Sequence, residues 1–163
     1  MRNSNLSPYS LQYSIHPPSK FIRTHSDQLL PGWSAPVLSV LIVVQPCKLA
    51  LVDRTAETEV HKFHLRQKFT ELGYKIVSQL QQSGHFADLF DPKTGLPMFS
   101  IPGQIRLDDV AVIRSTLGYD VLSRGGCLTI RHPVWGSAVY PSILVTSACP
   151  QTLKRIVELH LGV

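Results

Sequence analysis

The sequence predicts an α+β fold with a largely antiparallel sheet and flanking helices. The predicted strands outnumber the predicted helices, and most of them follow one another without a helix between them, as antiparallel strands do. The chain has 163 residues, of which 44% are hydrophobic and 17% charged, so it has the size of one compact domain and can bury a core. We predict a mostly irregular N-terminal arm over residues 1–34 and a single α+β domain over residues 35–163.

The first strong strand is expected directly after this arm. Residues 1–34 are rich in Ser, Pro, His and Asn, which predicts an arm with one weak element. Residues 37–44 are mostly aliphatic and β-branched and end before Pro46, which favours a buried strand in the middle of the sheet. Residues 49–52 could continue as a second strand.

The clearest predicted helix covers residues 62–83. Its apolar residues recur every three or four positions and therefore share one face, and Gly84 follows as a stop. These apolar residues are Leu65, Phe69, Leu72, Ile76 and Leu80. Polar and acidic residues between Asp53 and Glu59 are typical of a helix start, so the first residue of the helix is left open.

A strand, a turn and a partner strand are predicted after this helix. Residues 86–90 have the composition of a strand, and the Asp, Pro and Gly of residues 91–95 are typical of a turn. Residues 96–100 are expected to run back from the turn as an edge strand, because Pro97 cannot donate a hydrogen bond to a ladder.

The remaining elements are short. Asp108 or Asp109 is expected to cap a helix that ends at Gly118. Short runs separated by Gly, Pro and Ser predict four strands, at residues 119–122, 128–131, 134–140 and 142–146. Residues 150–161 carry a proline in the first turn and apolar residues on one side, which predicts a closing helix.

Charge and cysteine usage limit the classes of partner and compartment. Sixteen Lys and Arg against eleven Asp and Glu give a formal charge of +5, but the longest basic run is Lys154-Arg155, so no nucleic-acid partner is expected. No signal-peptide pattern or bilayer-length apolar run is found, so we expect a soluble, cytoplasmic chain with no membrane partner. An odd number of widely spaced cysteines favours a reducing compartment over disulfides or a CxxC zinc site. They are Cys47, Cys127 and Cys149.

Two aspartates stand out in residues 86–96. Asp88 lies among apolar neighbours on a short strand, so it either points to solvent or is buried with a partner that offsets its desolvation. Asp91 is interpreted as a turn former rather than a general base.

The second informative segment is residues 125–136. Gly125 and Gly126 permit close approach of a ligand or another chain, and Cys127 follows in a region that holds Arg131 and His132. A thiol near cations has a lowered pKa and is a better metal ligand or nucleophile. The alternative is a buried cysteine on a strand with Arg and His at its end. Cys47 and Cys149 are expected to be packing thiols.

Two further side chains of this segment are candidates for shaping a binding surface. Arg131 offers a fork of donors that can hold carbonyls or Asp88, and Trp135 adds a large apolar face. Elsewhere, His61 and His64 lack an HExxH context and are interpreted as a surface pair, and no GxGxxG, P-loop or GxSxG motif occurs.

In these segments the chain resembles the methylmalonic aciduria and homocystinuria type D protein family. The resemblance rests on an aromatic-Ala-Asp segment ending in Asp-Pro-x-x-Gly-Leu, on a Leu-Gly-aromatic triplet, and on Gly-x-Cys-x-x-Ile-Arg-His-x-x-Trp-Gly. These motifs occupy residues 86–96, 117–119 and 125–136, and the weaker match extends over residues 36–150.

The resemblance implies a fold similar to flavin-dependent nitroreductases, without flavin and without enzymatic activity. It implies an adaptor that receives cobalamin from a processing protein and directs it to a cobalamin-dependent methyltransferase or mutase. A soft cysteine thiolate would be a ligand of the cobalt. The implied cobalamin-binding residues are Gly125, Gly126, Cys127, Arg131, His132 and Trp135. The alternative function is a flavin-dependent reductase of the same fold.

One departure from the family pattern concerns the thiolate. The animal proteins carry two adjacent cysteines of which the first is the cobalt ligand, whereas this chain has Gly126 and then Cys127. Either Cys127 reaches the cobalt, or this chain binds cobalamin without a thiolate. An irregular glycine loop would absorb the shift of one residue and is the expected backbone, since on a regular strand neighbours face opposite sides. The long N-terminal extension of the animal proteins is also missing, so a minimal cytosolic form is expected.

Overall fold

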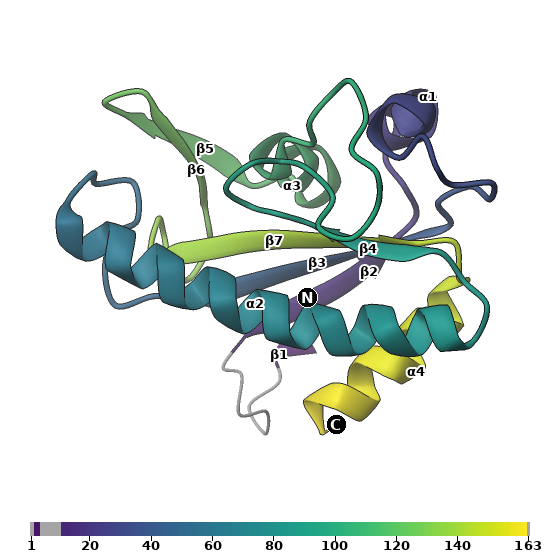
Figure 1. Ribbon diagram of the computed structural model, residues 1–163. Coiled ribbons are helices and arrows are strands. Elements are labelled where there is room, and N and C mark those ends of the chain that lie inside the picture. The colour runs from purple at the N-terminus through teal and green to yellow at the C-terminus, as the bar shows by residue number, and fades with distance from the viewer. Residues whose placement is uncertain (1, 4–10, 163) are drawn as a thin grey trace.

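A five-stranded antiparallel sheet forms the centre of the molecule (Figure 1). The computed structural model describes residues 2–3 and 11–162. The strands lie in the order β1-β2-β3-β7-β4, and each pairs antiparallel with its neighbours. Their bounds are β1 Arg2–Asn3, β2 Gln12–His16, β3 Ser39–Pro46, β7 Val139–Thr146 and β4 Ala87–Phe90. The α+β class and the antiparallel sheet are thus confirmed.

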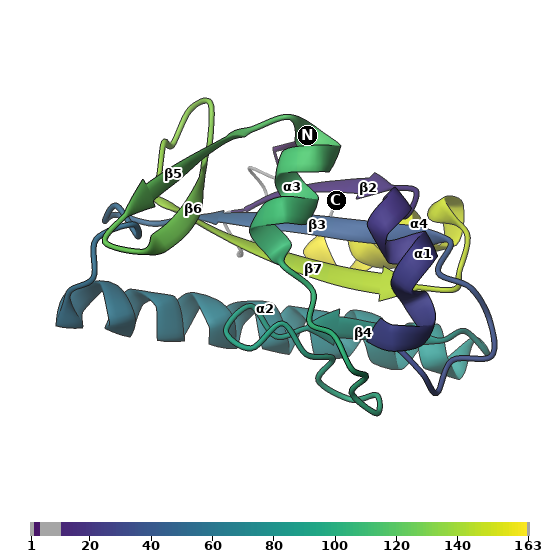
Figure 2. The same ribbon diagram turned by 90° about the horizontal axis from the view of Figure 1, so that it is seen from above.

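Four helices and a small hairpin cover the two faces of this sheet. Helices α2 and α4 lie on one face, and α1, α3 and the β5-β6 hairpin lie on the other (Figures 1 and 2). The bounds are α1 Lys20–Leu29, α2 Ala56–Gln82, α3 Asp109–Leu117, α4 Pro150–Leu161, β5 Asp120–Arg124 and β6 Cys127–Arg131. None of the helices in the described ranges is long and apolar enough to cross a bilayer.

Strand β3 is the central strand that the sequence predicts. Its residues alternate between the two layers: Leu41 and Val43 pack against α2 and α4, whereas Ile42 and Val44 pack against the α1 and α3 side. Because both faces are covered, the strand is apolar at nearly every position.

Most predicted helices and turns are confirmed, and the start of α2 is now placed. The Thr55 side chain accepts a hydrogen bond from the Thr58 backbone N–H, and Thr58 returns one to Thr55, so a capping box starts the helix at Ala56. Strand β4, the 91–95 turn, α3 with Asp108 as its cap, and α4 agree with expectation.

The expectation of a mostly irregular arm is wrong for residues 11–30. Strand β2 pairs with the whole inner part of β3, and α1 buries Ile22 and Leu29 in the core. The segment is polar because it exposes much of its surface, and the pairing partner that stabilises β2 is distant in sequence. The division into an arm and a single domain otherwise stays a prediction.

Three predicted strands are also corrected. Residues 49–52 form a turn, and residues 96–100 form a loop that carries only one isolated bridge, between Phe90 and Pro97. Residues 134–138 are likewise a loop, and β7 runs without a break through Pro141. The carbonyls of Ala138 and Thr146 accept hydrogen bonds from residues that flank β3, whereas the Ser147 N–H donates to Phe86 before β4, so the odd-numbered residues of β7 direct their backbone toward β4. Pro141 is one of them and lies beyond the end of β4, where no described strand needs its N–H.

Candidate functional site

The six residues predicted to bind cobalamin fall into two groups at opposite ends of the hairpin. Gly125 and Gly126 form the turn between β5 and β6, with φ angles of 57° and 80°, whereas His132 and Trp135 follow the last residue of β6. The five residues of β6 separate the groups by about 16 Å at the usual rise per residue.

Gly125 and Gly126 occupy turn positions whose backbone conformation favours glycine. Two consecutive positive φ angles are what a tight two-residue hairpin turn requires, and Gly accepts them without strain. Cys127 is the first residue of β6 and pairs with Arg124, so the predicted irregular loop at Cys127 is wrong: the backbone there is a regular strand. Arg124 in turn forms an ion pair with Asp53, at 2.5 Å, which ties the hairpin to the loop before α2.

His132 is a buried structural residue. Its Nδ1 accepts hydrogen bonds from the backbone N–H groups of Val134 and Trp135, both at 3.1 Å, so the proton lies on Nε2, which donates to Gln12 Oε1 at 2.7 Å. The ring stacks on Trp135 with centroids 4.5 Å apart, and burial lowers the pKa of His132. His132 is therefore neutral and fixes the base of the hairpin to β2.

The predicted role of the cations beside Cys127 is corrected accordingly. The neutral His132 offers no positive charge to a thiolate, and Arg131 is exposed at the other end of β6. Arg131 does not hold Asp88 either: in the described part of the chain, the hydrogen bonds to that carboxylate come from backbone N–H groups.

Asp88 is buried with backbone partners, one of the two situations that the sequence left open. Its carboxylate is fully buried and accepts hydrogen bonds from Leu89, Met98, Phe99 and Ser100, at 2.6 to 3.2 Å. An ionised carboxylate has only acceptors, so a ring of N–H donors suits it. Asp88 thereby fixes the 97–100 loop against β4.

Asp91 shapes the turn, as predicted, and also holds α2. Its Oδ1 accepts from the Lys93 backbone N–H, and both carboxylate oxygens accept from Arg66, at 2.7 and 2.6 Å. The hydrogen bond from Arg66 lowers the pKa of Asp91. Gly95 completes the turn: its φ is 72°, and a Cβ there would lie 2.7 Å from the Leu107 carbonyl oxygen.

The other cysteines and histidines of the described ranges are not gathered into a metal-binding cluster. Cys149 is exposed at the N-cap of α4, where a hydrogen bond with Thr152 lowers the pKa of its thiol, so the prediction of a packing thiol is wrong for Cys149; Cys47 is half-buried. Within residues 2–3 and 11–162, no three metal-ligating side chains lie together.

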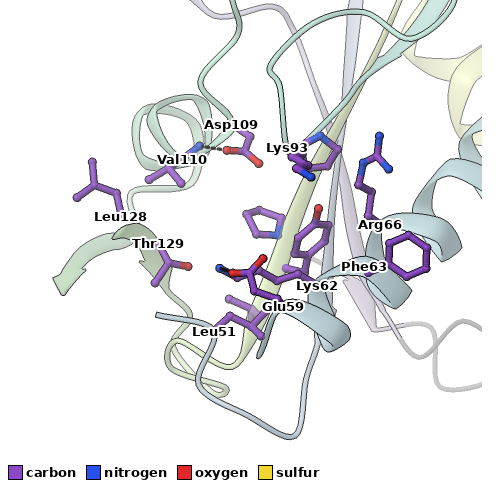
Figure 3. Close-up of a pocket in the computed structure, with 14 residues that line it drawn as sticks. Leu51, Glu59, Lys62, Phe63, Arg66, Lys93, Asp109, Val110, Leu128 and Thr129 are labelled. Atoms are coloured by element: carbon purple, nitrogen blue, oxygen red, sulfur yellow. Dashed lines mark hydrogen bonds and ion pairs between the residues drawn. The ribbon is translucent and has the colours of Figure 1, made fainter. Parts of the chain in front are cut away.

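A pocket of about 370 Å³ lies where β4 ends and β7 continues (Figure 3). It is bounded by the first half of α2, the turn after β4, the start of α3, the middle of β6 and the first half of β7. Its lining residues are Leu51, Glu59, Lys62, Phe63, Arg66, Pro92, Lys93, Asp109, Val110, Leu128, Thr129, Val139, Tyr140 and Pro141. The volume is at the lower end of the range of about 300–1,000 Å³ found for small-molecule sites.

Two acidic groups in the pocket have shifted pKa values. Burial raises the pKa of Asp109 to about 7, and Asp108 next to it adds to the rise. Burial also raises the pKa of Tyr140, with a contribution from the negative charges of Asp109 and Asp91. Perturbed groups gathered in one pocket are typical of functional sites.

Sequence comparisons agree with the motif resemblance. A profile of the methylmalonic aciduria and homocystinuria type D protein family matches residues 3–158. This chain belongs to that family. The cobalamin trafficking protein CblD of Homo sapiens is 29% identical over 133 residues, 82% of this chain and 45% of the human protein. The proteins of the same name from Rattus norvegicus and Gallus gallus are 29% and 27% identical, and they too are matched over 44% and 45% of their length. The chain thus spans less than half of these relatives.

The family motifs acquire distinct roles in the structure. The 86–96 motif lines one side of the pocket with Pro92 and Lys93, in a turn that Asp91 and Gly95 shape. The 125–136 motif builds a hairpin with a glycine turn and a histidine base. The pocket residues Tyr140 and Lys93 were missed as site residues, and Asp109 was considered only as a helix cap. They come from three separate segments, and Lys93 stands at an unspecified position of the 86–96 motif, so no local pattern marks the three as one site; only the tertiary structure brings them together.

Proposed function

We propose that this chain is a cytoplasmic cobalamin-trafficking adaptor without enzymatic activity. It receives cobalamin from a processing protein and passes it to a cobalamin-dependent methyltransferase or mutase. The observation that carries the proposal is the family match over residues 3–158, with relatives that are named cobalamin trafficking proteins.

The size of the pocket supports binding of cobalamin on the surface rather than inside. Cobalamin is a corrin macrocycle with amide side chains and a nucleotide tail, larger than the ligands that a pocket of about 370 Å³ encloses. The hairpin, by contrast, carries exposed residues: the turn glycines have no side chains, and Leu128 is 56% exposed. A corrin shared between this surface and a partner protein fits a transient handover.

Within this proposal, Gly125, Gly126 and Cys127 form the contact surface. Because the regular strand at Cys127 replaces the glycine loop expected to absorb the shift of one residue, a cobalt-thiolate bond from Cys127 is a separate step of the proposal, which the Cys127→Ser spectrum tests. A thiolate is a soft ligand that can occupy an axial position and be displaced at delivery. Arg131, His132 and Trp135 act from the base of the hairpin, where His132 and Trp135 hold its direction relative to β2.

The test is an absorbance titration of cobalamin with this chain, alone and with a cobalamin-processing protein of the same organism. A change in the cobalt spectrum is expected in the mixture, and Cys127→Ser is expected to remove its thiolate component. Cys149→Ser is the matched control, because Cys149 is an exposed cysteine outside the hairpin, at the N-cap of α4. No spectral change in any mixture would contradict the proposal, and a spectrum unchanged by Cys127→Ser would remove the cobalt-thiolate step.

The purified protein also tests the alternative function, a flavin-dependent reductase. An adaptor is expected to purify without flavin and to reduce no nitro compound. Stoichiometric flavin absorbance in the purified protein would favour a flavin-dependent reductase instead.

A further inference from the structure

The pocket beside β7, beyond the end of β4, contains a tyrosine hydroxyl that has no hydrogen-bond partner among the described residues. Tyr140 is 9% exposed and lines the pocket, yet its hydroxyl makes no hydrogen bond with any residue that the structure describes. Unlike Ser142 Oγ, the Tyr140 hydroxyl is not sealed from the solvent, so it is open to the pocket and can donate a hydrogen bond there. A ligand atom in the pocket would supply the missing partner.

Some of the charged side chains around the pocket have an ion-pair partner and others do not. Lys62 pairs with Glu59 at 3.4 Å, and both carboxylate oxygens of Asp91 are bound to Arg66. Lys93 makes no side-chain hydrogen bond or ion pair within residues 2–3 and 11–162, and it lines the pocket near Asp109 and Val110 (Figure 3). One ammonium group is therefore available to an anion.

The rest of the lining is largely apolar. Phe63 of α2 and Leu128 of β6 lie on opposite sides of the pocket, and each is more than half exposed (Figure 3). The other apolar lining residues are Val110, Pro92, Val139 and Pro141. Two lining carboxylates, Glu59 and Asp109, oppose a multiply charged anion. A phosphate dianion would need more unpaired cations than Lys93 alone.

We propose that this pocket binds a small organic monocarboxylate with an apolar body. The carboxylate accepts a hydrogen bond from the Tyr140 hydroxyl and is paired with the Lys93 ammonium, while its apolar body packs between Phe63 and Leu128. The ligand is smaller than cobalamin, so this site is additional to the proposed trafficking surface, with which it shares Leu128, and the proposal does not depend on cobalamin binding.

The test uses benzoate as the probe and benzyl alcohol as its neutral counterpart. Each is titrated into ¹⁵N-labelled protein, and amide shifts are followed by NMR. Benzoate is expected to give saturable shifts at residues that line the pocket, with benzyl alcohol binding at least about fivefold more weakly, because it lacks the charge that pairs with Lys93.

Three variants make the test specific. Tyr140→Phe and Lys93→Gln are each expected to weaken benzoate binding about fivefold or more. Tyr140→Phe removes a hydroxyl that has no partner in the described chain, and Lys93 is exposed, so both variants are expected to fold. Lys68→Gln, an exposed lysine of α2 outside the pocket, is the control and is expected to change nothing. Absence of saturable shifts, equal binding of the two probes, or equal losses in all three variants would overturn the proposal.

Discussion

Ser142 and Ser39 are fully buried serines on neighbouring strands that differ in one hydrogen bond. Ser39 Oγ donates to the Ala148 carbonyl at 2.7 Å, whereas Ser142 Oγ has no partner among the described residues. We expect Ser142→Ala to raise the free energy of unfolding by about 1 kcal/mol, because it removes an unsatisfied polar group. Ser39→Ala is expected to lower it by about 1 kcal/mol. Urea unfolding of both variants measures the difference, and equal destabilisation would contradict it.

The ring of N–H donors around Asp88 predicts that replacing this carboxylate by an amide strongly lowers the free energy of unfolding. In Asp88→Asn the side chain loses its charge and one acceptor, and its NH₂ group would face backbone donors. We expect a loss of about 2–4 kcal/mol in the free energy of unfolding. Asp27→Asn, at an exposed position of α1, is the control. If Asp88→Asn lowers the free energy of unfolding no more than Asp27→Asn does, the 97–100 loop does not depend on the charge of Asp88.

At the scale of elements, the β5-β6 hairpin is held at its turn, at its base and by one ion pair. The turn is Gly125-Gly126, the base is His132 bound to Gln12, and Arg124 pairs with Asp53 beside the turn. A two-stranded hairpin is marginal alone, so these attachments decide its direction relative to the main sheet.

Two substitutions of Gly125 in the β5-β6 turn separate the effect of backbone conformation from the effect of side-chain size. Gly125 has a φ of 57° and open space around its Cβ position, so Gly125→Asn is expected to keep the hairpin, since Asn tolerates this conformation. Gly125→Val is expected to destabilise the hairpin by about 1–2 kcal/mol. Amide hydrogen exchange of β5 and β6 measures this; equal protection in the two variants would be evidence against a strained turn.

At the scale of the whole molecule, Asp109 couples stability to pH. The folded pKa of about 7 lies above the ordinary 3.8, so between these values the folded state binds more protons than the unfolded state. The contribution of Asp109 is therefore present at low pH and is lost as pH rises through 7. The charged or titratable groups around it are Asp108 on α3, Tyr140 on β7, Glu59, Lys62 and Arg66 on α2, and Lys93 after β4.

Comparison with Asp109→Asn isolates this contribution. Relative to the variant, the free energy of unfolding of the wild type is expected to fall by about 2 kcal/mol between pH 5 and pH 8. Buried His132 and ion-paired Asp91 titrate in both proteins and cancel in the difference. Urea unfolding at several pH values measures it, and parallel curves would show that Asp109 is ionised throughout.

The sequence by itself determined the elements whose signals are local. Strand β3, helix α2, the 91–95 turn and helix α4 follow from apolar period, capping residues and turn residues, all of which act within a few positions. The family was likewise recognisable from the 86–96 and 125–136 motifs.

Only the tertiary structure decided the rest. Strand β2 and the passage of β7 through Pro141 depend on pairing partners that are distant in sequence, and the attachment of His132 to β2 depends on Gln12, 120 positions away. The pocket around Tyr140 exists because β4 ends before β7 does. Burial, pairing and pKa are set by neighbours in space, and a local pattern carries no information about which distant residues those neighbours are.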